Sequence, residues 1–117
     1  MVSPSIGDVV LIPFPYSDLS QAKRRPALII ADVGMGDFVL CQITSRSYAD
    51  RLAIPLFESD FAEGGLKRES FVRIGKLFTA NVSIITGVAG TLNSVKMSEV
   101  LDALVDILRR GLKDYTF

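Results

Sequence analysis

Lys23-Arg24-Arg25-Pro26-Ala27-Leu28-Ile29-Ile30 joins three cations to a run of residues that is too apolar to lie on a surface. The run favours a buried strand, which would hold the cations rigidly at the rim of a core. A second apolar run, Phe38-Val39-Leu40-Cys41-Gln42-Ile43, follows a glycine-bearing turn and ends in Thr44-Ser45-Arg46. If the start of the first strand and the end of the second are neighbours, their cations and hydroxyls form a site for an anion.

Further short strands are expected around this pair. The residues after Gly7-Asp8 are β-branched and aromatic, and prolines mark the end of that strand. A short strand that contains Pro55 belongs at a sheet edge, because proline cannot donate to a ladder. A polar loop is expected at 16–22. The strands predicted from the sequence are 9–14, 25–31, 37–44, 52–56, 70–76 and 84–88.

One long amphipathic helix follows the strands, and a single helical turn is expected before it at 59–65. We expect Asn93 or Ser94 to cap the long helix and Gly111 to end it in the left-handed conformation. Several short strands with one C-terminal helix predict a mainly β (β-rich α+β) fold, a curled antiparallel sheet capped by that helix. Its predicted apolar face comprises Met97, Val100, Leu101, Leu104, Val105 and Leu108.

Length and composition set the broad class of the protein. A chain of 117 residues suits one domain, residues 1–117. No run approaches the roughly eighteen apolar residues of a membrane span, and no signal sequence is recognisable, so we expect a cytoplasmic protein without a membrane partner. Hydrophobic residues make up 49% of the chain, with a mean hydropathy of +0.36, which suggests that a second subunit covers some of the apolar surface.

The charge balance excludes a strongly basic nucleic-acid-binding domain. Thirteen cationic and thirteen anionic residues give a formal net charge of zero, so any binding of a polyanion has to be local. The cations do cluster along the chain, although scattered surface charge is the ordinary explanation for any one cluster. The clusters are Lys23 to Arg25, Arg46 with Arg51, Lys67 with Arg68, and Arg73 with Lys76.

The inventory of side chains removes most catalytic classes. With no histidine and one cysteine, the chain cannot form a histidine–cysteine zinc site, a Ser-His-Asp triad or a Cys-His dyad. We expect no metal and no cofactor. Asp60 and Glu63 can in principle hold magnesium, but two acids one turn apart are more often a solvated helix face. Cys41 lies within an apolar run and is interpreted as a small core hydrophobe.

Arginines and hydroxyls at strand ends remain as candidates for chemistry. An arginine offers a planar fork of donors that suits phosphate oxygens, and it stabilises developing negative charge without accepting a proton. Alternatives stay open for each residue. Arg25 also suits a surface ion pair with Asp18 or Glu69, Thr44 an ordinary packing role in a strand, and Arg73 a plain outward-facing position.

The order of these motifs resembles the MazF/PemK toxin family. The resemblance rests on Gly7-Asp8-Val9-Val10, Arg25-Pro26-Ala27-Leu28-Ile29-Ile30, Gln42-Ile43-Thr44-Ser45 and Ser70-Phe71-Val72-Arg73, and it extends from about Gly7 to Gly111. It implies an SH3-like barrel of the MazF/PemK/CcdB type and a homodimer. It also implies a toxin that cleaves single-stranded RNA at short sequences without a metal and is inhibited by a cognate antitoxin.

The resemblance also assigns roles to individual residues. It makes Arg25 and Thr44 catalytic, in a reaction in which the ribose 2′-hydroxyl attacks the adjacent phosphate. Unlike some members of the family, the chain has no histidine in its first loop and carries Gly75 where they have an acid, so Asp18 or a water is left as the base. The expected substrate-binding residues are Ser17, Asp18, Gln21, Lys23, Arg24, Ser45, Arg46 and Arg73.

Two other functions are kept as alternatives. One is a toxin with the same barrel that binds a protein target such as DNA gyrase, and the other is an inactive SH3-like binding module. Neither requires an arginine and a threonine to meet at one site. Incubation with a defined RNA separates them from a nuclease.

Overall fold

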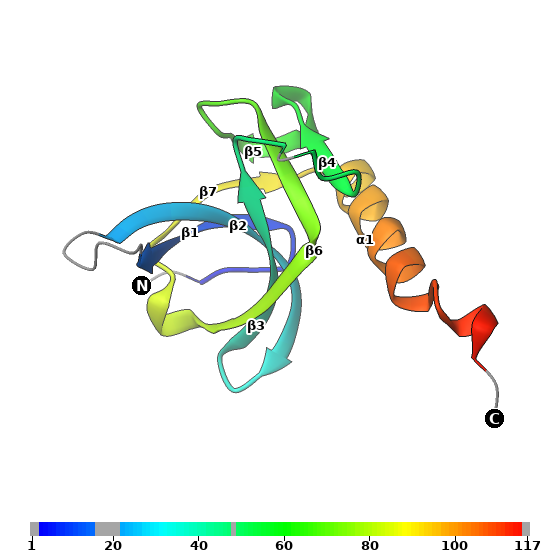
Figure 1. Cartoon of the computed structure of the whole chain (residues 1–117). Coiled ribbons are helices and arrows are strands. Elements are labelled where there is room, and N and C mark those ends of the chain that lie inside the picture. The colour runs from blue at the N-terminus through cyan, green and yellow to red at the C-terminus, as the bar shows by residue number, and fades with distance from the viewer. Residues whose placement is uncertain (1–2, 16–21, 48, 116–117) are drawn as a thin grey trace.

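The computed structural model describes residues 3–15, 22–47 and 49–115, and within them seven strands form one antiparallel sheet in the order β4-β6-β3-β2-β1-β7-β5. The sheet curls into a half-open barrel, and α1 projects away from it (Figure 1). This confirms the mainly β fold with a C-terminal helix. The elements are β1 Asp8–Pro15, β2 Ala22–Gly34, β3 Asp37–Thr44, β4 Ala53–Leu56, β5 Phe61–Gly64, β6 Ser70–Asn81, β7 Gly87–Leu92 and α1 Ser94–Arg109.

The two longest strands carry the curvature of the sheet. β2 and β6 continue well beyond their expected ends, and the β2–β3 and β3–β6 pairings both shift register part-way along. Such irregularities let a strand bend without leaving the sheet. β3 has the bounds expected from the sequence, and β4 pairs only with β6, so the edge position predicted for the Pro55 strand is confirmed.

Two expected elements were wrong. Residues 82–84 form a 3₁₀ turn and the next strand, β7, begins at Gly87, because the Asn81 side chain accepts a hydrogen bond from the Ser83 N–H and starts a turn there. The helical turn expected at 59–65 is a 3₁₀ turn at Glu58–Asp60 followed by β5, which pairs with β7.

The curled sheet buries side chains on both of its faces. On one face, Leu28, Ile43 and Val72 pack with Val100 and Leu104 of α1. A second cluster contains residues of the same strands that alternate with these, among them Val10, Ile29 and Leu40. Cys41 belongs to the first cluster, and burial raises the pKa of its thiol to about 12, in keeping with the core role expected for it.

Helix α1 begins as expected, but its packed face is shifted, because Ala103 and Ile107 join Met97, Val100 and Leu104 against the core. The Asn93 side chain accepts a hydrogen bond from the Lys96 N–H at 2.8 Å, which confirms the predicted cap. Of the six predicted apolar positions only Val100 and Leu104 are buried. Gly111 has a φ of −81°, so the expected left-handed ending was wrong. No helix in the described part of the chain is long and apolar enough to cross a membrane.

Candidate functional site

The termini of four neighbouring strands lie along one side of the sheet, which we call the strand-end edge. Because neighbouring strands are antiparallel, β4 and β3 end at this strand-end edge, and β6 and β2 begin there. The pairs that mark this edge are Leu56 with Ser70 and Thr44 with Phe71. The residues that enter β6 therefore lie beside the end of β3, and the end of β3 lies beside the start of β2.

A groove of about 510 Å³ lies at this edge, and we call it the cationic groove. Six of its twelve described lining residues are Lys or Arg, and none of the twelve is acidic. A protein with no net charge therefore concentrates positive charge at one place, as an anion-binding surface requires. The lining residues are Lys23, Arg24, Arg25, Pro26, Ile43, Thr44, Ser45, Arg46, Leu66, Lys67, Arg68 and Ser70.

Arg25 and Thr44 both line the cationic groove. The last β2–β3 pair before the edge is Ala27 with Gln42, and continuation of this antiparallel register brings Arg25 opposite Thr44. Thr44 is 5% exposed, and its Oγ1 accepts a hydrogen bond from the Arg46 N–H at 3.2 Å. The backbone thus fixes the hydroxyl oxygen, whose own hydrogen can be donated to another acceptor.

The other expected site residues divide into three groups. Lys23, Arg24, Ser45 and Arg46 are exposed and line the same groove. Ser17, Asp18 and Gln21, together with residues 16–21 of the loop expected at 16–22, lie outside the described residues, and Ala22 begins β2. Arg73 does not line the groove. Its Nε donates to Asp50 Oδ2 at 3.0 Å, and both side chains are largely shielded from solvent.

Asp50 organises the connection between β3 and β4. Its Oδ1 accepts from the Leu52 N–H at 2.9 Å while its Oδ2 accepts from Arg73. These donors, the Leu52 amide first and the Arg73 guanidinium second, hold the pKa of the Asp50 carboxyl below its usual value. Arg73 therefore contributes to the shape of the chain that follows Thr44.

The sequence matches the family described as PemK-like, MazF-like toxin of type II toxin-antitoxin system over residues 5–108. The chain belongs to this family. No curated protein matches it. Its fold is similar to that of an endoribonuclease in complex with its cognate antitoxin from a mycobacterial species, with a TM-score of 0.69 and 18% identity over 92% of this chain and 95% of that one.

Two further solved structures share the fold. One is a MazE-MazF complex from Deinococcus radiodurans, with a TM-score of 0.71 and 21% identity over 90% of this chain and 95% of that one. The other is the Mycobacterium tuberculosis toxin MazF-mt6, with a TM-score of 0.58 and 19% identity over 92% and 99% of the two chains. These likenesses confirm the MazF-type fold expected from the sequence.

In this MazF-like toxin, Lys67 and Arg68 were missing from the expected site. They belong to the segment between β5 and β6 and line the groove together with Arg25. In the sequence they are visible as two cations just before a strand. The neighbouring residues do not indicate that the folded chain brings this segment close to the start of β2. The pair supplies two of the six positive charges.

The groove is suited to binding phosphate groups. Arginine forks donate to phosphate oxygens in pairs, lysines add point charges, and the Thr44 and Ser45 hydroxyls add neutral donors. The magnesium alternative at Asp60 is weakened, because Asp60 Oδ2 accepts from the Phe57 N–H at 2.7 Å and lies 3.6 Å from the Lys96 ammonium.

Proposed function

We propose that this toxin is a metal-independent, sequence-specific endoribonuclease that cleaves single-stranded RNA. One observation carries the proposal: Arg25 and Thr44 share a groove whose described lining holds six cations and no acid. A groove of this kind attracts a polyanion and grips one of its phosphates with two different donors.

The chemistry suits a site that has no histidine and no reactive cysteine. RNA supplies its own nucleophile, since the 2′-oxygen can attack the adjacent phosphorus while the bond from phosphorus to the 5′-oxygen breaks. The products are a 2′,3′-cyclic phosphate and a free 5′-hydroxyl. The 2′-hydroxyl loses a proton and the leaving 5′-oxygen gains one, with Asp18 or a water as the base.

Arg25 and Thr44 have separate roles in this proposal. The Arg25 guanidinium stabilises the charge that gathers on the phosphate oxygens in the transition state. The Thr44 hydroxyl, fixed by its hydrogen bond from the Arg46 N–H, donates to one of those oxygens and orients the phosphate.

The remaining expected site residues bind the flanking RNA in our proposal. Lys23, Arg24 and Arg46 contact neighbouring phosphates, Ser45 adds a donor, and Lys67 and Arg68 join them. Ser17, Asp18 and Gln21 contact the substrate from the first loop. We assign Arg73 to positioning, because its Nε is engaged by Asp50.

The wider setting follows from the family. We propose that residues 1–117 act as one toxin domain in the cytoplasm, as a homodimer, and that a cognate antitoxin inhibits it by laying an acidic segment along the cationic groove. The antitoxin complexes among the similar structures support this partner.

The test is incubation of the purified protein with a defined single-stranded RNA in the presence of a chelator. We expect cuts at a short sequence, with 2′,3′-cyclic phosphate and 5′-hydroxyl ends and with no cleavage of the matching DNA. Intact RNA with a folded protein would overturn the proposal in favour of a protein-binding toxin or an inactive module.

A further inference from the structure

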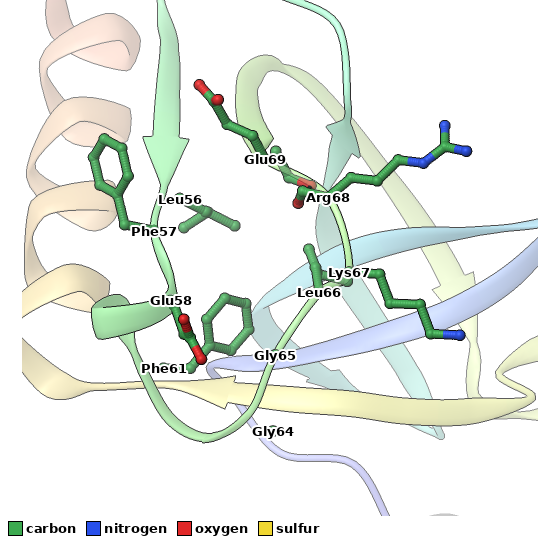
Figure 2. Close-up of a pocket in the computed structure, with 11 residues that line it drawn as sticks. Leu56, Phe57, Glu58, Phe61, Gly64, Gly65, Leu66, Lys67, Arg68 and Glu69 are labelled. Atoms are coloured by element: carbon green, nitrogen blue, oxygen red, sulfur yellow. The ribbon is translucent and has the colours of Figure 1, made fainter.

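A second pocket adjoins the cationic groove, and the two share Leu66, Lys67, Arg68 and Ser70. We call it the aromatic pocket. It has a volume of about 470 Å³ and lies between the end of β4 and the segment that enters β6. Its remaining lining residues are Leu56, Phe57, Glu58, Phe61, Gly64, Gly65 and Glu69 (Figure 2).

The two sides of the shared segment differ in chemistry. Figure 2 shows the Lys67 and Arg68 side chains extending to one side of the segment, while the Phe57 ring lies on the other. The aromatic pocket adds two phenyl rings and the carboxylates of Glu58 and Glu69, neither of which lines the cationic groove. A ligand that fits both sites is therefore anionic where it meets the cationic groove. Where it meets the aromatic pocket, it presents a flat surface to the phenyl rings and hydrogen-bond donors to the carboxylates.

The pocket wall is held in place before any ligand arrives. Phe57 donates its N–H to Asp60 Oδ2 at 2.7 Å and accepts from the Asp60 N–H at 2.9 Å, so its backbone is fixed. Asp60 is in turn tied to the helix, because its carbonyl accepts from the Asn93 N–H at 2.8 Å. Phe57 is nevertheless 55% exposed, whereas Phe61 packs against the core.

We propose that the aromatic pocket holds the base of a nucleotide next to the scissile phosphate, with Phe57 as the stacking surface. The proposal rests on the proposed nuclease function. An exposed aromatic ring on a fixed backbone beside a phosphate-binding groove suits the stacking of an unstacked RNA base. The carboxylates of Glu58 and Glu69 accept from the amino group that adenine, cytosine and guanine carry and uracil lacks. An acidic peptide fits less well, because these carboxylates repel it.

The test compares cleavage and binding by Phe57 variants. Single-turnover cleavage is measured on RNAs whose bases on each side of the cut are varied, and binding is measured on a 2′-O-methyl analogue that cannot be cut. We expect wild type to prefer an amino-bearing base at one flanking position by about tenfold. Phe57→Ala should lose about tenfold in cleavage and in binding of the analogue, Phe57→Tyr should retain both, and Glu58→Ala with Glu69→Ala should remove the preference.

Leu77→Ala is the matched control, because Leu77 is 41% exposed and lines neither pocket. If Phe57→Ala cuts and binds every RNA like wild type, the aromatic pocket serves another partner and the inference is overturned. If wild type binds the analogue in a Phe57-dependent way but cuts no RNA, the base site stands and the nuclease proposal falls. If wild type neither binds nor cuts RNA, both fall.

Discussion

Thr44 shows how a largely buried residue can still line a surface groove. The residue is 5% exposed because β3 lies between β2 and β6, yet it lines the cationic groove. The bond from the Arg46 N–H removes the freedom of the hydroxyl oxygen. A donor that is already oriented loses little entropy when it binds a phosphate.

Replacement of this hydroxyl is the first prediction. Thr44→Val keeps the shape but removes the donor, and we expect the single-turnover cleavage rate to fall by about 10²-fold or more. Thr44→Ser should stay within about tenfold of wild type, because it keeps the hydroxyl. Equal rates for the Val and Ser variants would show that the hydroxyl takes no part.

Asp50 gives a prediction about pH. Because its folded-state pKa is lowered, its stabilising effect is present above the unfolded pKa of about 3.9 and is lost as the pH falls through the folded value. We expect Asp50→Asn to lower the free energy of unfolding by about 1 kcal/mol at pH 7 and by much less at the most acidic pH at which the protein stays folded, where the wild-type carboxyl is protonated. Urea unfolding at the two pH values measures this, and a cost that does not change with pH would contradict it.

At the scale of elements, β5 is held by the close approach of two backbones. Gly64 of β5 pairs with Gly90 of β7, and a Cβ on Gly90 would lie 2.6 Å from the Glu63 carbonyl oxygen and 2.8 Å from the Gly65 nitrogen. Real Cβ atoms do not come so near, so only glycine suits this position. The same contact sets one wall of the aromatic pocket, which Gly64 and Gly65 line.

We therefore expect Gly90→Ala to lower the free energy of unfolding by about 2 kcal/mol or more. Gly75→Ala is the control, because its nearest neighbour would be Leu52 Cδ1 at 3.8 Å, an ordinary contact. Urea unfolding of both variants measures the difference. Equal free energies of unfolding for the two variants would contradict the close backbone approach between β5 and β7.

The same elements show what the sequence can and cannot predict. β3 was predicted with its bounds because its apolar residues are buried by both neighbouring strands. β5 was missed because Phe61-Ala62-Glu63-Gly64 has no alternation, and its extended form comes from pairing with β7. The predicted strand ends were enough to expect Arg25 and Thr44 at one site, and both line the cationic groove. Lys67 and Arg68 could not be predicted as part of that site, since only the folded chain brings their segment to the groove.

At the scale of the whole molecule, a second apolar stripe on α1 is left uncovered. Its side chains follow a spacing of four and three residues on the side of the helix that does not pack against the sheet. Exposed apolar surface of this kind typically marks an interaction site. The stripe comprises Leu101, Val105 and Leu108, which are 37%, 52% and 72% exposed. Leu112, in the 3₁₀ turn after the helix, is 53% exposed as well.

This surface supports the proposed homodimer. Light scattering of the purified toxin at micromolar concentration should give twice the chain mass of 12.8 kDa. A dimer would also allow two cationic grooves to serve one RNA. A mass of 12.8 kDa at that concentration would contradict the homodimer and leave the stripe to another partner.

The central claim is that one guanidinium in the cationic groove stabilises the transition state of RNA cleavage. The measurement is the single-turnover rate and product ends for wild type, Arg25→Ala and Arg109→Ala, an exposed arginine in the last turn of α1 that lines no described pocket. We predict cyclic-phosphate ends for wild type and Arg109→Ala at equal rates, and a loss of about 10²- to 10³-fold for folded Arg25→Ala. Cleavage by Arg25→Ala at the wild-type rate would contradict the claim.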